Sequence, residues 1–294
     1  MFVKAIEVAT EFTRPLLSIE RFYGSSEVLR GASTLFFVNG DGWALTCKHV
    51  ANLIVGANQL GARKQQFEQE LAAMSGKKKE KQIRRELEQK FQVDRKKVFE
   101  IKNRFINCVE GQSQWTIQAH PKYDVALLHF EKFTKLSCSS FPTFAKDGSD
   151  LKQGKSLCRL GFPFPEFTNY RYDPATDAIE WTSTGKDVTP IFPIEGMLTR
   201  HLGDDQGNIM GFELSTPGLR GQSGCPVFDV EGRVWGMQSA TNHLDLDFDV
   251  DQEVIRGGVK RKVKDSAFLH VGHCVHVDVL KEFLTSKGVS FKEG

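Results

Sequence analysis

Short apolar runs bounded by turn residues recur along most of the chain. Several contain about 4 to 8 residues and are rich in Val, Leu and Phe: TLFFV, WALT, DVALLHF, SLCRLGF, GFELS, CPVFD and RVWGMQ. Gly, Pro, Asn or Asp lies at their ends. Runs of this kind are typical of an all-β barrel or sandwich. Two hairpin turns, at 38–43 and 229–235, lie in different halves of the chain and indicate two similar β units.

Residues 61–104 follow a different period, because their apolar positions are spaced by three and four. These positions are Phe67, Leu71, Met74, Ile83, Leu87, Phe91, Val98, Ile101 and Phe105. The spacing predicts helices with one apolar stripe. The segment has 14 Lys and Arg against 7 Asp and Glu, a net charge of +7, and the rest of the chain has 25 against 30, a net charge of −5. We therefore expect a basic helical insertion in an acidic β protein.

A second helix is predicted over 277–288, with Gly288 as its C-terminal cap. The 294 residues, 40% of them hydrophobic, predict a globular chain of one large domain or two small ones. The net charge of +2 gives no overall field for nucleic acid. No apolar run reaches the roughly 18 residues of a membrane span, and the N-terminus lacks the apolar core of a secretory signal. We expect a cytoplasmic protein that binds neither nucleic acid nor membranes.

The cysteines and histidines do not form a metal-binding pattern. The six cysteines contain no C-x-x-C pair, so reduced, partly buried thiols are expected. His270, His273 and His276 repeat every three residues, which does not match zinc-site spacing and is explained more simply by a strand or loop edge. The sequence therefore predicts neither a metal nor a cofactor.

Three segments together indicate a nucleophilic site. The stretch RGQSGCPVFD, at 220–229, places Ser223 between two glycines, in a turn that can present a hydroxyl and several backbone N–H groups. A serine is a weak nucleophile until a base takes its proton, and an acid must orient that base. ALTCKHVAN places His49 just after one apolar strand, and HPKYDVALLHF places Asp124 at the start of another. The chain order is therefore His49, Asp124, Ser223.

At these segments the sequence resembles the chymotrypsin-fold serine peptidases, whose catalytic residues follow the order His, Asp, Ser. Among the branches of this family, its motifs most resemble those of the HtrA-type bacterial branch. GASTLFFVNGDGWALTCKHV resembles that branch's run into T-x-x-H-V, YDVALLHF its D-[IL]-A-x-L strand, LCRLGFPF its strand ending in G-x-P-F, and GQSGCPVFDVEGRVWGMQS its G-N-S-G-G-P segment with the following hairpin. EGMLTR resembles the strand that precedes the nucleophile region, and VGHCVHVDVLKEFL resembles the final strand and helix. The resemblance covers nearly the whole chain apart from the helical insertion.

The resemblance implies a mainly β, two-barrel chymotrypsin-like fold with a helical insertion in the first barrel and a C-terminal helix. The first barrel, 14–145, would carry His49 as the general base and Asp124 as the acid that orients it. The second barrel, 146–294, would carry Ser223 as the nucleophile. The backbone N–H groups of Gly221 and Ser223 would bind the oxyanion. The implied activity is that of a serine endopeptidase acting on proteins or peptides.

The family's geometry also implies a first specificity pocket, lined by Pro217, Ser239, Ala240 and Thr241. None of these residues is acidic, so we expect a small or medium apolar residue before the scissile bond. The sequence departs from the family at Cys225, where Gly is usual. It also has Gln222 where secreted digestive members carry an acid that pairs with a new N-terminus, so no such activation step is expected. No PDZ domain is expected after the C-terminal helix.

Alternative interpretations of the same residues remain. Taken singly, Ser223 fits a turn serine, His49 a core or surface histidine, and Asp124 a cap. An α/β-hydrolase fits less well, because G-x-S-x-G fails at Cys225. A protein of the peptidase fold could also be a binding or scaffold protein that acts through its insertion. In either case the insertion would control access to the cleft, recruit a partner or self-associate, and the acidic segment 245–253 is a candidate surface for its basic face.

Overall fold

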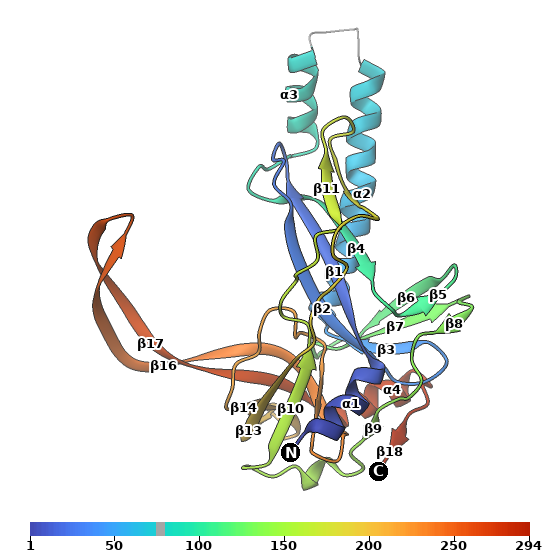
Figure 1. Cartoon of the computed structure of the whole chain (residues 1–294), viewed down its shortest axis with the longest axis vertical. Coiled ribbons are helices and arrows are strands. Elements are labelled where there is room, and N and C mark those ends of the chain that lie inside the picture. The colour runs from blue at the N-terminus through green and yellow to red at the C-terminus, as the bar shows by residue number, and fades with distance from the viewer. Residues whose placement is uncertain (75–79) are drawn as a thin grey trace.

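The structure, a computed structural model, describes residues 1–74 and 80–294. Its helices are α1 (Val3–Phe12), α2 (Lys48–Met74), α3 (Glu80–Lys90) and α4 (Val277–Ser286). Figure 1 shows a β body from which α2 and α3 project in one direction and a long β hairpin in another. The two projections leave the body far apart in space.

The first sheet contains six antiparallel strands in the order β4-β1-β2-β3-β7-β6. They are β1 (Thr13–Phe22), β2 (Leu29–Phe37), β3 (Trp43–Thr46), β4 (Val98–Phe105), β6 (Gln114–Ala119) and β7 (Ala126–Glu131). The predicted runs WALT and DVALLHF form the two buried central strands β3 and β7. Their register pairs Thr46, at the end of β3, with Ala126, at the start of β7. The chain that leaves β3 is therefore adjacent to the turn that enters β7.

The second sheet contains β9 (Thr143–Phe144), β10 (Ser156–Gly161), β13 (Phe192–Gly203), β14 (Ile209–Leu214), β15 (Pro226–Phe228), β16 (Arg233–Arg256), β17 (Val259–His276) and β18 (Lys292–Glu293). Its order is β15-β10-β13-β14-β17-β16-β9-β18, and β15 also pairs with β16. That extra pairing closes six strands into a barrel. Two small hairpins lie outside the main sheets, β5 (Val109–Glu110) with β8 (Lys135–Leu136), and β11 (Tyr170–Asp173) with β12 (Ala178–Trp181).

One hydrophobic core spans the two sheets. Phe36 of the first sheet packs against Phe144 of the second, with ring centroids 6.4 Å apart. Helix α1, which the sequence analysis did not predict, covers both sheets, because its Phe2 contacts Phe228 and its Phe12 contacts Phe36. The boundary between 145 and 146 stays a prediction, although β9, ending at Phe144, already belongs to the second sheet.

The helical insertion differs from its prediction at both ends. Helix α2 begins at Lys48, well before residue 61, and α3 ends at Lys90. Residues 98–105 were expected to be helical, but they form β4, which pairs with β1 from Leu16 to Phe22. Spacings of three and four do not decide between helix and strand over so short a segment, and pairing with β1 supplies the backbone hydrogen bonds. Residues 75–79, between the two helices, lie outside the described residues.

The apolar stripe of the insertion is buried within the projection and against the first sheet. Phe67 of α2, together with Ile83 and Leu87 of α3, forms a small core with Tyr23, which follows β1. The rings of Tyr23 and Phe99 pack edge to face with centroids 4.9 Å apart. The projection therefore has its own core, separate from the main one.

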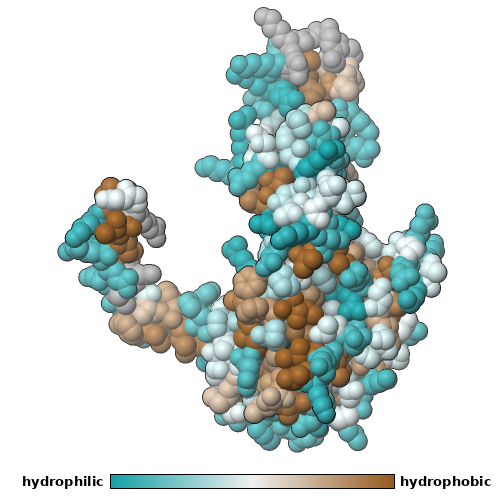
Figure 2. All heavy atoms as spheres, in the orientation of Figure 1, coloured by the Kyte–Doolittle hydropathy of each residue, from teal (hydrophilic) through white to brown (hydrophobic). Residues whose placement is uncertain are grey.

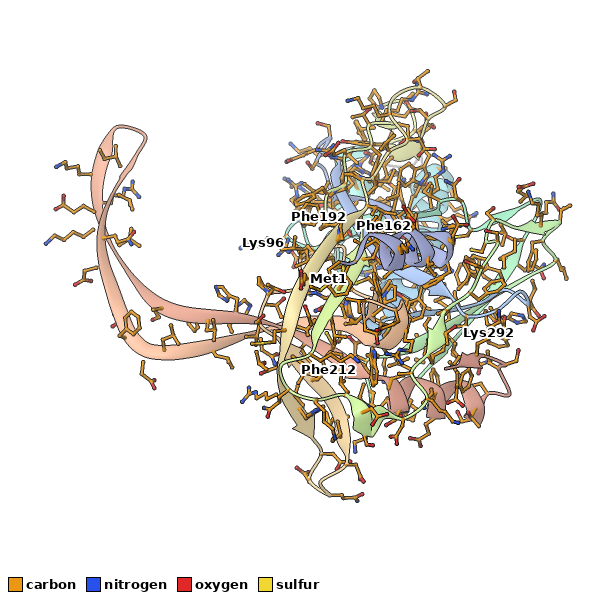
Figure 3. The ribbon with its side chains drawn as sticks, turned by 60° about the horizontal axis from the view of Figure 1, so that its bottom comes forward. Met1, Lys96, Phe162, Phe192, Phe212 and Lys292 are labelled. Atoms are coloured by element: carbon orange, nitrogen blue, oxygen red, sulfur yellow. The ribbon has the colours of Figure 1, made fainter. Side chains whose placement is uncertain are left out.

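The β16–β17 hairpin extends beyond the barrel as an arm, here defined as residues 244–269. The sequence analysis interpreted part of it, 245–253, as an acidic loop. The structure places that segment in β16, paired with basic positions of β17, for example Glu253 with Lys262. Leu246, Phe248 and Phe268 are each more than 40% exposed on this arm. Figure 2 shows apolar residues at the surface along part of the arm, and Figure 3 shows the arm extending away from the body.

The predicted turn at 38–43 and the end of the C-terminal helix are confirmed. The turn at 38–43 closes a hairpin in which the Val38 N–H donates to the Trp43 carbonyl, and α4 ends before Gly288, whose φ is +67°. All six cysteines are free, and the three histidines of HVGHCVH lie on β17. Among the described residues, no helix has the length and apolar character needed to cross a membrane.

Candidate active site

His49 and Asp124 meet where the first sheet joins α2. His49 is the second residue of α2, and Asp124 lies in the turn just before β7. Asp124 Oδ2 lies 2.8 Å from His49 Nδ1, and Asp124 Oδ1 accepts a hydrogen bond of 2.9 Å from the His49 backbone N–H. The first N–H groups of a helix have no partner within it, so the carboxylate satisfies one of them. The pair is therefore produced by the β3–α2 junction and the register of β7.

Asp124 is held in its ionised form. Burial by itself would raise the pKa of this carboxyl group, but hydrogen bonds from the His49 ring, the Ser239 hydroxyl and the His49 backbone outweigh burial and lower it to about 2. An ionised carboxylate only accepts hydrogen bonds, so the proton of a neutral His49 ring lies on Nδ1. Nε2 is then left as an acceptor that can take a proton.

Ser223 lies in the loop between β14 and β15, and the two glycines beside it are required by geometry. Gly221 has φ +93°, and a Cβ atom there would come within 2.3 Å of the Phe162 carbonyl oxygen. Gly224 has φ +87°, and its Cβ would come within 2.2 Å of the Thr34 carbonyl oxygen. Positive φ and close backbone approach both exclude larger residues. The loop is therefore pressed against the strands on both sides.

This loop presents two unsatisfied backbone donors. In residues 1–74 and 80–294, the N–H groups of Gly221 and Ser223 have no hydrogen-bond acceptor. The alternating N–H groups of Gln222 and Gly224 donate instead to the carbonyls of Leu219 and Gln238, at 3.0 and 2.9 Å. The arrangement leaves the two donors predicted for an oxyanion free to bind an oxygen.

Thr34 of β2 fixes the Ser223 loop, and the sequence analysis did not single it out. Its Oγ1 donates to the Gly221 carbonyl at 2.7 Å, and its backbone N–H donates to the Ser223 carbonyl at 3.0 Å. Thr34 is fully buried. The signal in the sequence was only the small-residue run GAST before an apolar strand, which does not reveal a contact across the two sheets.

Ser239 links Asp124 to Ser223. Its hydroxyl donates to Asp124 Oδ2 at 2.6 Å, and its carbonyl accepts a hydrogen bond of 3.3 Å from Ser223 Oγ. Ser239 was predicted only as a pocket residue. Among the described residues, the Ser223 hydroxyl has this hydrogen bond and none to His49, and such bonds are often loose before substrate binds.

A pocket of about 550 Å³ opens beside Ser223. All four residues predicted for the specificity pocket line it, namely Pro217, Ser239, Ala240 and Thr241. Its lining also includes Gln238, Arg220, His243 and His270, which the sequence analysis did not assign to a pocket. These additional residues come from the loop before Ser223 and from the base of the arm.

A second hollow, of about 620 Å³, has His49 in its lining. Apart from His49 and Ile101 it is lined by residues of α2: Asn52, Leu53, Gly56, Gln59, Leu60 and Arg63. The lower part of the helical projection therefore forms a wall next to the histidine.

The two departures from the family pattern are accommodated locally. Gln222 is buried, its Oε1 accepts from the Leu219 N–H at 3.1 Å, and its Nε2 donates to the Phe192 carbonyl at 3.3 Å. A neutral amide thus ties down the loop from within. Cys225 is also buried and is not among the residues with positive φ, so its side chain brings no backbone strain.

Cys47 lies close enough to His49 and Asp124 to be considered as a metal ligand, since one ligand atom of each lies within 4.8 Å of the others. Burial raises the pKa of the Cys47 thiol well above its usual range, and the thiol donates to the Gln238 carbonyl. A thiol ligates metals in its ionised form. The contacts therefore favour a hydrogen-bonding role, and the absence of a metal stays a prediction.

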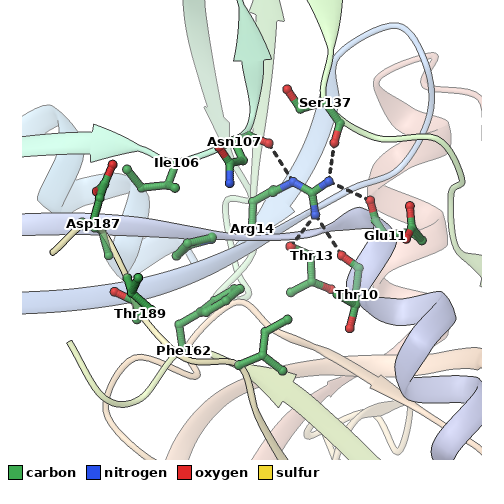
Figure 4. A pocket seen from close by; sticks show the side chains of 14 residues that line it. Thr10, Glu11, Thr13, Arg14, Ile106, Asn107, Ser137, Phe162, Asp187 and Thr189 are labelled. Carbon is green, nitrogen blue, oxygen red and sulfur yellow. Dashed lines mark hydrogen bonds between the residues drawn. The ribbon is translucent and has the colours of Figure 1, made fainter. Parts of the chain in front are cut away.

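A further pocket near the N-terminus surrounds Arg14 and lies apart from these residues (Figure 4). The Arg14 guanidinium donates to five backbone carbonyls, those of Thr10, Glu11, Thr13, Asn107 and Ser137. Its donors are occupied by the protein itself, so Arg14 joins α1 to the loops beside β5 and β8. The arrangement indicates a structural role.

A family model and several solved structures are similar to this chain. The chain matches a family model described as the trypsin-like peptidase domain over residues 33–237, a range that includes His49, Asp124 and Ser223. A solved structure of the active form of the Rv3671c protease from M. tuberculosis is similar over 98% of this chain and 86% of its own, with 13% identity and a TM-score of 0.46. The HtrA-type protease AlgW with a decapeptide is similar over 97% and 67%, with 12% identity and a TM-score of 0.48.

No curated protein sequence is significantly similar to the chain. The family model covers well over half of the residues, and this match shows the family of the chain. It agrees with the mainly β architecture and the closed second barrel. The chain belongs to the family of trypsin-like peptidase domains and has the two-barrel fold of that family.

Proposed function

We propose that the protein is a serine endopeptidase that hydrolyses peptide bonds through His49, Asp124 and Ser223. The observation that carries this proposal is the His49–Asp124 hydrogen bond, connected through Ser239 to the Ser223 hydroxyl. The two free N–H groups beside Ser223 support it, because acyl transfer needs donors for a developing oxyanion.

The proposed reaction proceeds through an acyl-enzyme. The Ser223 hydroxyl turns from the Ser239 carbonyl toward His49, whose Nε2 takes the proton as Ser223 Oγ attacks the peptide carbonyl. The carbonyl oxygen becomes negative and accepts hydrogen bonds from the N–H groups of Gly221 and Ser223. The amine then leaves with the proton from His49, and an ester remains on Ser223. Water, deprotonated by His49, hydrolyses the ester and restores the hydroxyl.

Asp124 acts through His49 in this scheme. Its carboxylate keeps the proton on Nδ1 and stabilises the positive ring that forms when Nε2 is protonated. Because the same carboxylate also accepts from Ser239 and the His49 backbone, the ring is held at a fixed position. A fixed ring is needed for proton transfer in both directions.

We further propose that the helical projection controls access to the site and supplies no catalytic group. The α2 residues that line the hollow beside His49 would contact substrate on that side of the scissile bond. Exposed basic residues, among them Arg63, Lys81, Arg85, Arg95 and Lys96, suit an acidic segment of a substrate protein or partner. The HtrA-type assignment and a cytoplasmic location belong to the same proposal, and the six free thiols support a reducing compartment.

The alternative is a binding or scaffold protein that keeps the peptidase fold without turnover. The hydrogen bond from Ser223 Oγ to the Ser239 carbonyl, in place of one to His49, is the observation that favours it. The two functions differ in whether Ser223 can be made nucleophilic.

A fluorophosphonate probe tests the proposal, because it reacts covalently with an activated serine. The wild-type protein should be labelled and should cleave casein, whereas Ser223→Ala and His49→Ala should be labelled and cleave at background levels while keeping the wild-type circular dichroism spectrum. Absence of labelling in folded wild-type protein would favour the binding protein. Full activity of either variant would refute the assignment of these residues.

A further inference from the structure

The side chains that line the pocket beside Ser223 include basic residues and no acidic ones among the described residues. Of its lining residues, Arg220, His243 and His270 are positively charged or can become so, and none of the described lining residues is acidic. Two carboxylates that bond to residues in or next to the lining have other partners as well: Asp124 bonds to Ser239 and His49, and Glu213 bonds to Asn242 and Arg200. A side chain entering this pocket would therefore meet cations and hydrogen-bond donors.

A buried cation lies behind the pocket. Arg159 of β10 is fully buried, and its guanidinium donates to Gln238 Oε1 at 2.7 Å and to the carbonyls of Thr216 and Pro217 at 3.0 Å each. No carboxylate of the described residues forms an ion pair with it. Burying a charge without a counter-charge is costly, even when neutral oxygens satisfy most of its donors. The position thus lacks a negative partner within the described chain.

Gln238 connects this cation to the pocket. Its amide is almost fully buried, lines the pocket, and accepts from Arg159 through Oε1. A Cβ atom at Gly218, another lining residue, would come within 2.3 Å of Gln238 Nε2, so no side chain separates the pocket from this amide. Only the Gln238 side chain therefore lies between the Arg159 guanidinium and the pocket, in a region of low dielectric constant.

Other lining residues offer donors that have no partner among the described residues. The Nδ1 atoms of His243 and His270 are 2.6 Å apart, so one ring donates and the other accepts. A neutral ring that accepts at Nδ1 carries its proton on Nε2 and can donate there. The exposed Arg220 guanidinium, on the residue just before Gly221, has no ion pair or hydrogen bond with a described residue.

We propose that this pocket selects substrates with an acidic side chain, Glu or Asp, immediately before the scissile bond. The inference rests on the serine endopeptidase function proposed above. The substrate carboxylate accepts charge-assisted hydrogen bonds from Arg220 and the histidine pair, and supplies the counter-charge that Arg159 lacks. The apolar preference predicted from Pro217, Ser239, Ala240 and Thr241 did not include these cations, which lie outside that segment of the sequence.

Matched peptides test the charge separately from the shape. Fluorogenic tetrapeptides that differ only in the last residue, Glu, Gln, Asp, Asn, Leu or Arg, are compared by kcat/KM. We expect Glu to exceed its isostere Gln by about 10-fold or more, because the charge alone distinguishes them. Arg220→Ala should lower the Glu-to-Gln ratio by about 10-fold.

Two further variants and a control separate recognition from stability. Arg159→Met should also lower the Glu-to-Gln ratio. If that variant fails to fold, the double variant His270→Gln with Arg220→Ala is measured in its place and should lower the ratio. Arg171→Ala, which removes an exposed arginine of the β11–β12 hairpin, should leave the ratio unchanged. An enzyme that reacts with the fluorophosphonate but prefers Gln or Leu to Glu would overturn the pocket inference alone. A protein that neither reacts nor cleaves any peptide would contradict the proposed function and this inference with it.

Discussion

The two barrels contribute their parts of the site in different ways. In the first barrel, His49 and Asp124 are hydrogen-bonded to each other within one strand–helix junction. In the second, Ser223 lies in a loop whose conformation depends on Thr34 of the first barrel. The His49–Asp124 pair is thus a local product of one sheet, whereas the Ser223 loop needs both sheets to be packed together. Damage to either barrel should therefore affect activity by a different route.

The projections of the two barrels differ as well. The α2–α3 projection buries Phe67, Ile83 and Leu87 in a core of its own. The β16–β17 arm leaves Leu246, Phe248 and Phe268 exposed. A two-stranded ribbon has too few neighbours to bury both of its faces, whereas paired helices resting on a sheet can enclose an apolar stripe. Stability should therefore be concentrated in the helical projection.

The largest effect is expected from Asp124→Asn, which disrupts the pair within the first barrel. The amide can donate to His49, so the ring can take the wrong tautomer, and kcat should fall by about 10³- to 10⁴-fold. Steady-state cleavage of a fluorogenic peptide measures this. The variant should still fold, because the amide oxygen can accept from the His49 backbone N–H. A loss below 10-fold would mean that the pair does not orient the base.

The two projections are compared with one truncation in each. Leu87→Ala should destabilise the helical projection by about 2 to 4 kcal/mol, because it leaves a cavity in a buried cluster. Phe248→Ala, on the arm, should change stability by about 0.5 kcal/mol or less, because that ring is already 56% exposed. Urea unfolding and hydrogen exchange measure both. Equal effects would contradict the difference drawn between the projections, and fluorophosphonate labelling should stay unchanged in both variants.

A smaller effect is expected from Thr34→Val, which keeps the shape but removes the hydroxyl that binds the Gly221 carbonyl. That carbonyl and the Phe162 N–H, which donates to the same hydroxyl at 3.3 Å, would lose a partner. We expect a loss of about 1 to 3 kcal/mol in stability and about 10-fold in kcat through a displaced oxyanion site. Thr34→Ser, which retains the hydroxyl, is the matched control. Normal kcat in Thr34→Val would show that the loop holds its conformation without the Thr34 hydroxyl.

The smallest effect is a pH dependence of stability from the first barrel. The pKa of Asp124 is lowered from 3.8 to about 2 in the folded protein. The ionised carboxylate therefore stabilises the folded protein fully above the unfolded pKa, and this contribution is lost as pH falls through the folded pKa. The difference in unfolding free energy between wild type and Asp124→Asn should therefore shrink from pH 4 to pH 2. A difference that stays constant over this window would mean that the carboxyl group is not held ionised by its contacts.

Much of the site could be predicted because its local signals are strong. WALT and DVALLHF are short, apolar and bounded by turns, and they are the strands that end next to His49 and begin next to Asp124. The glycines around Ser223 are explained by positive φ and close contacts. Thr34 could not be predicted, because a threonine in a strand carries no sign of which loop of another barrel it will bind.

The elements that were predicted wrongly show what the sequence lacks. Residues 98–105 have helical spacing, yet they form β4 because β1 offers an open edge with matching hydrogen bonds. The segment 245–253 alternates acidic and apolar residues, which is a strand pattern, but its acidity suggested a loop until its pairing with β17 was known. In both cases the deciding partner is distant in the sequence.

The sequence by itself determined the short strands, the tight turns and the three segments that carry His49, Asp124 and Ser223, because hydrophobic period and backbone freedom act within a few residues. Only the tertiary structure decided that Ser239 joins Asp124 to Ser223 and that Arg159 lies behind the pocket without a carboxylate partner among the described residues. These are effects of hydrogen bonding and charge at short distance, and distances between remote segments are fixed only when both barrels are packed.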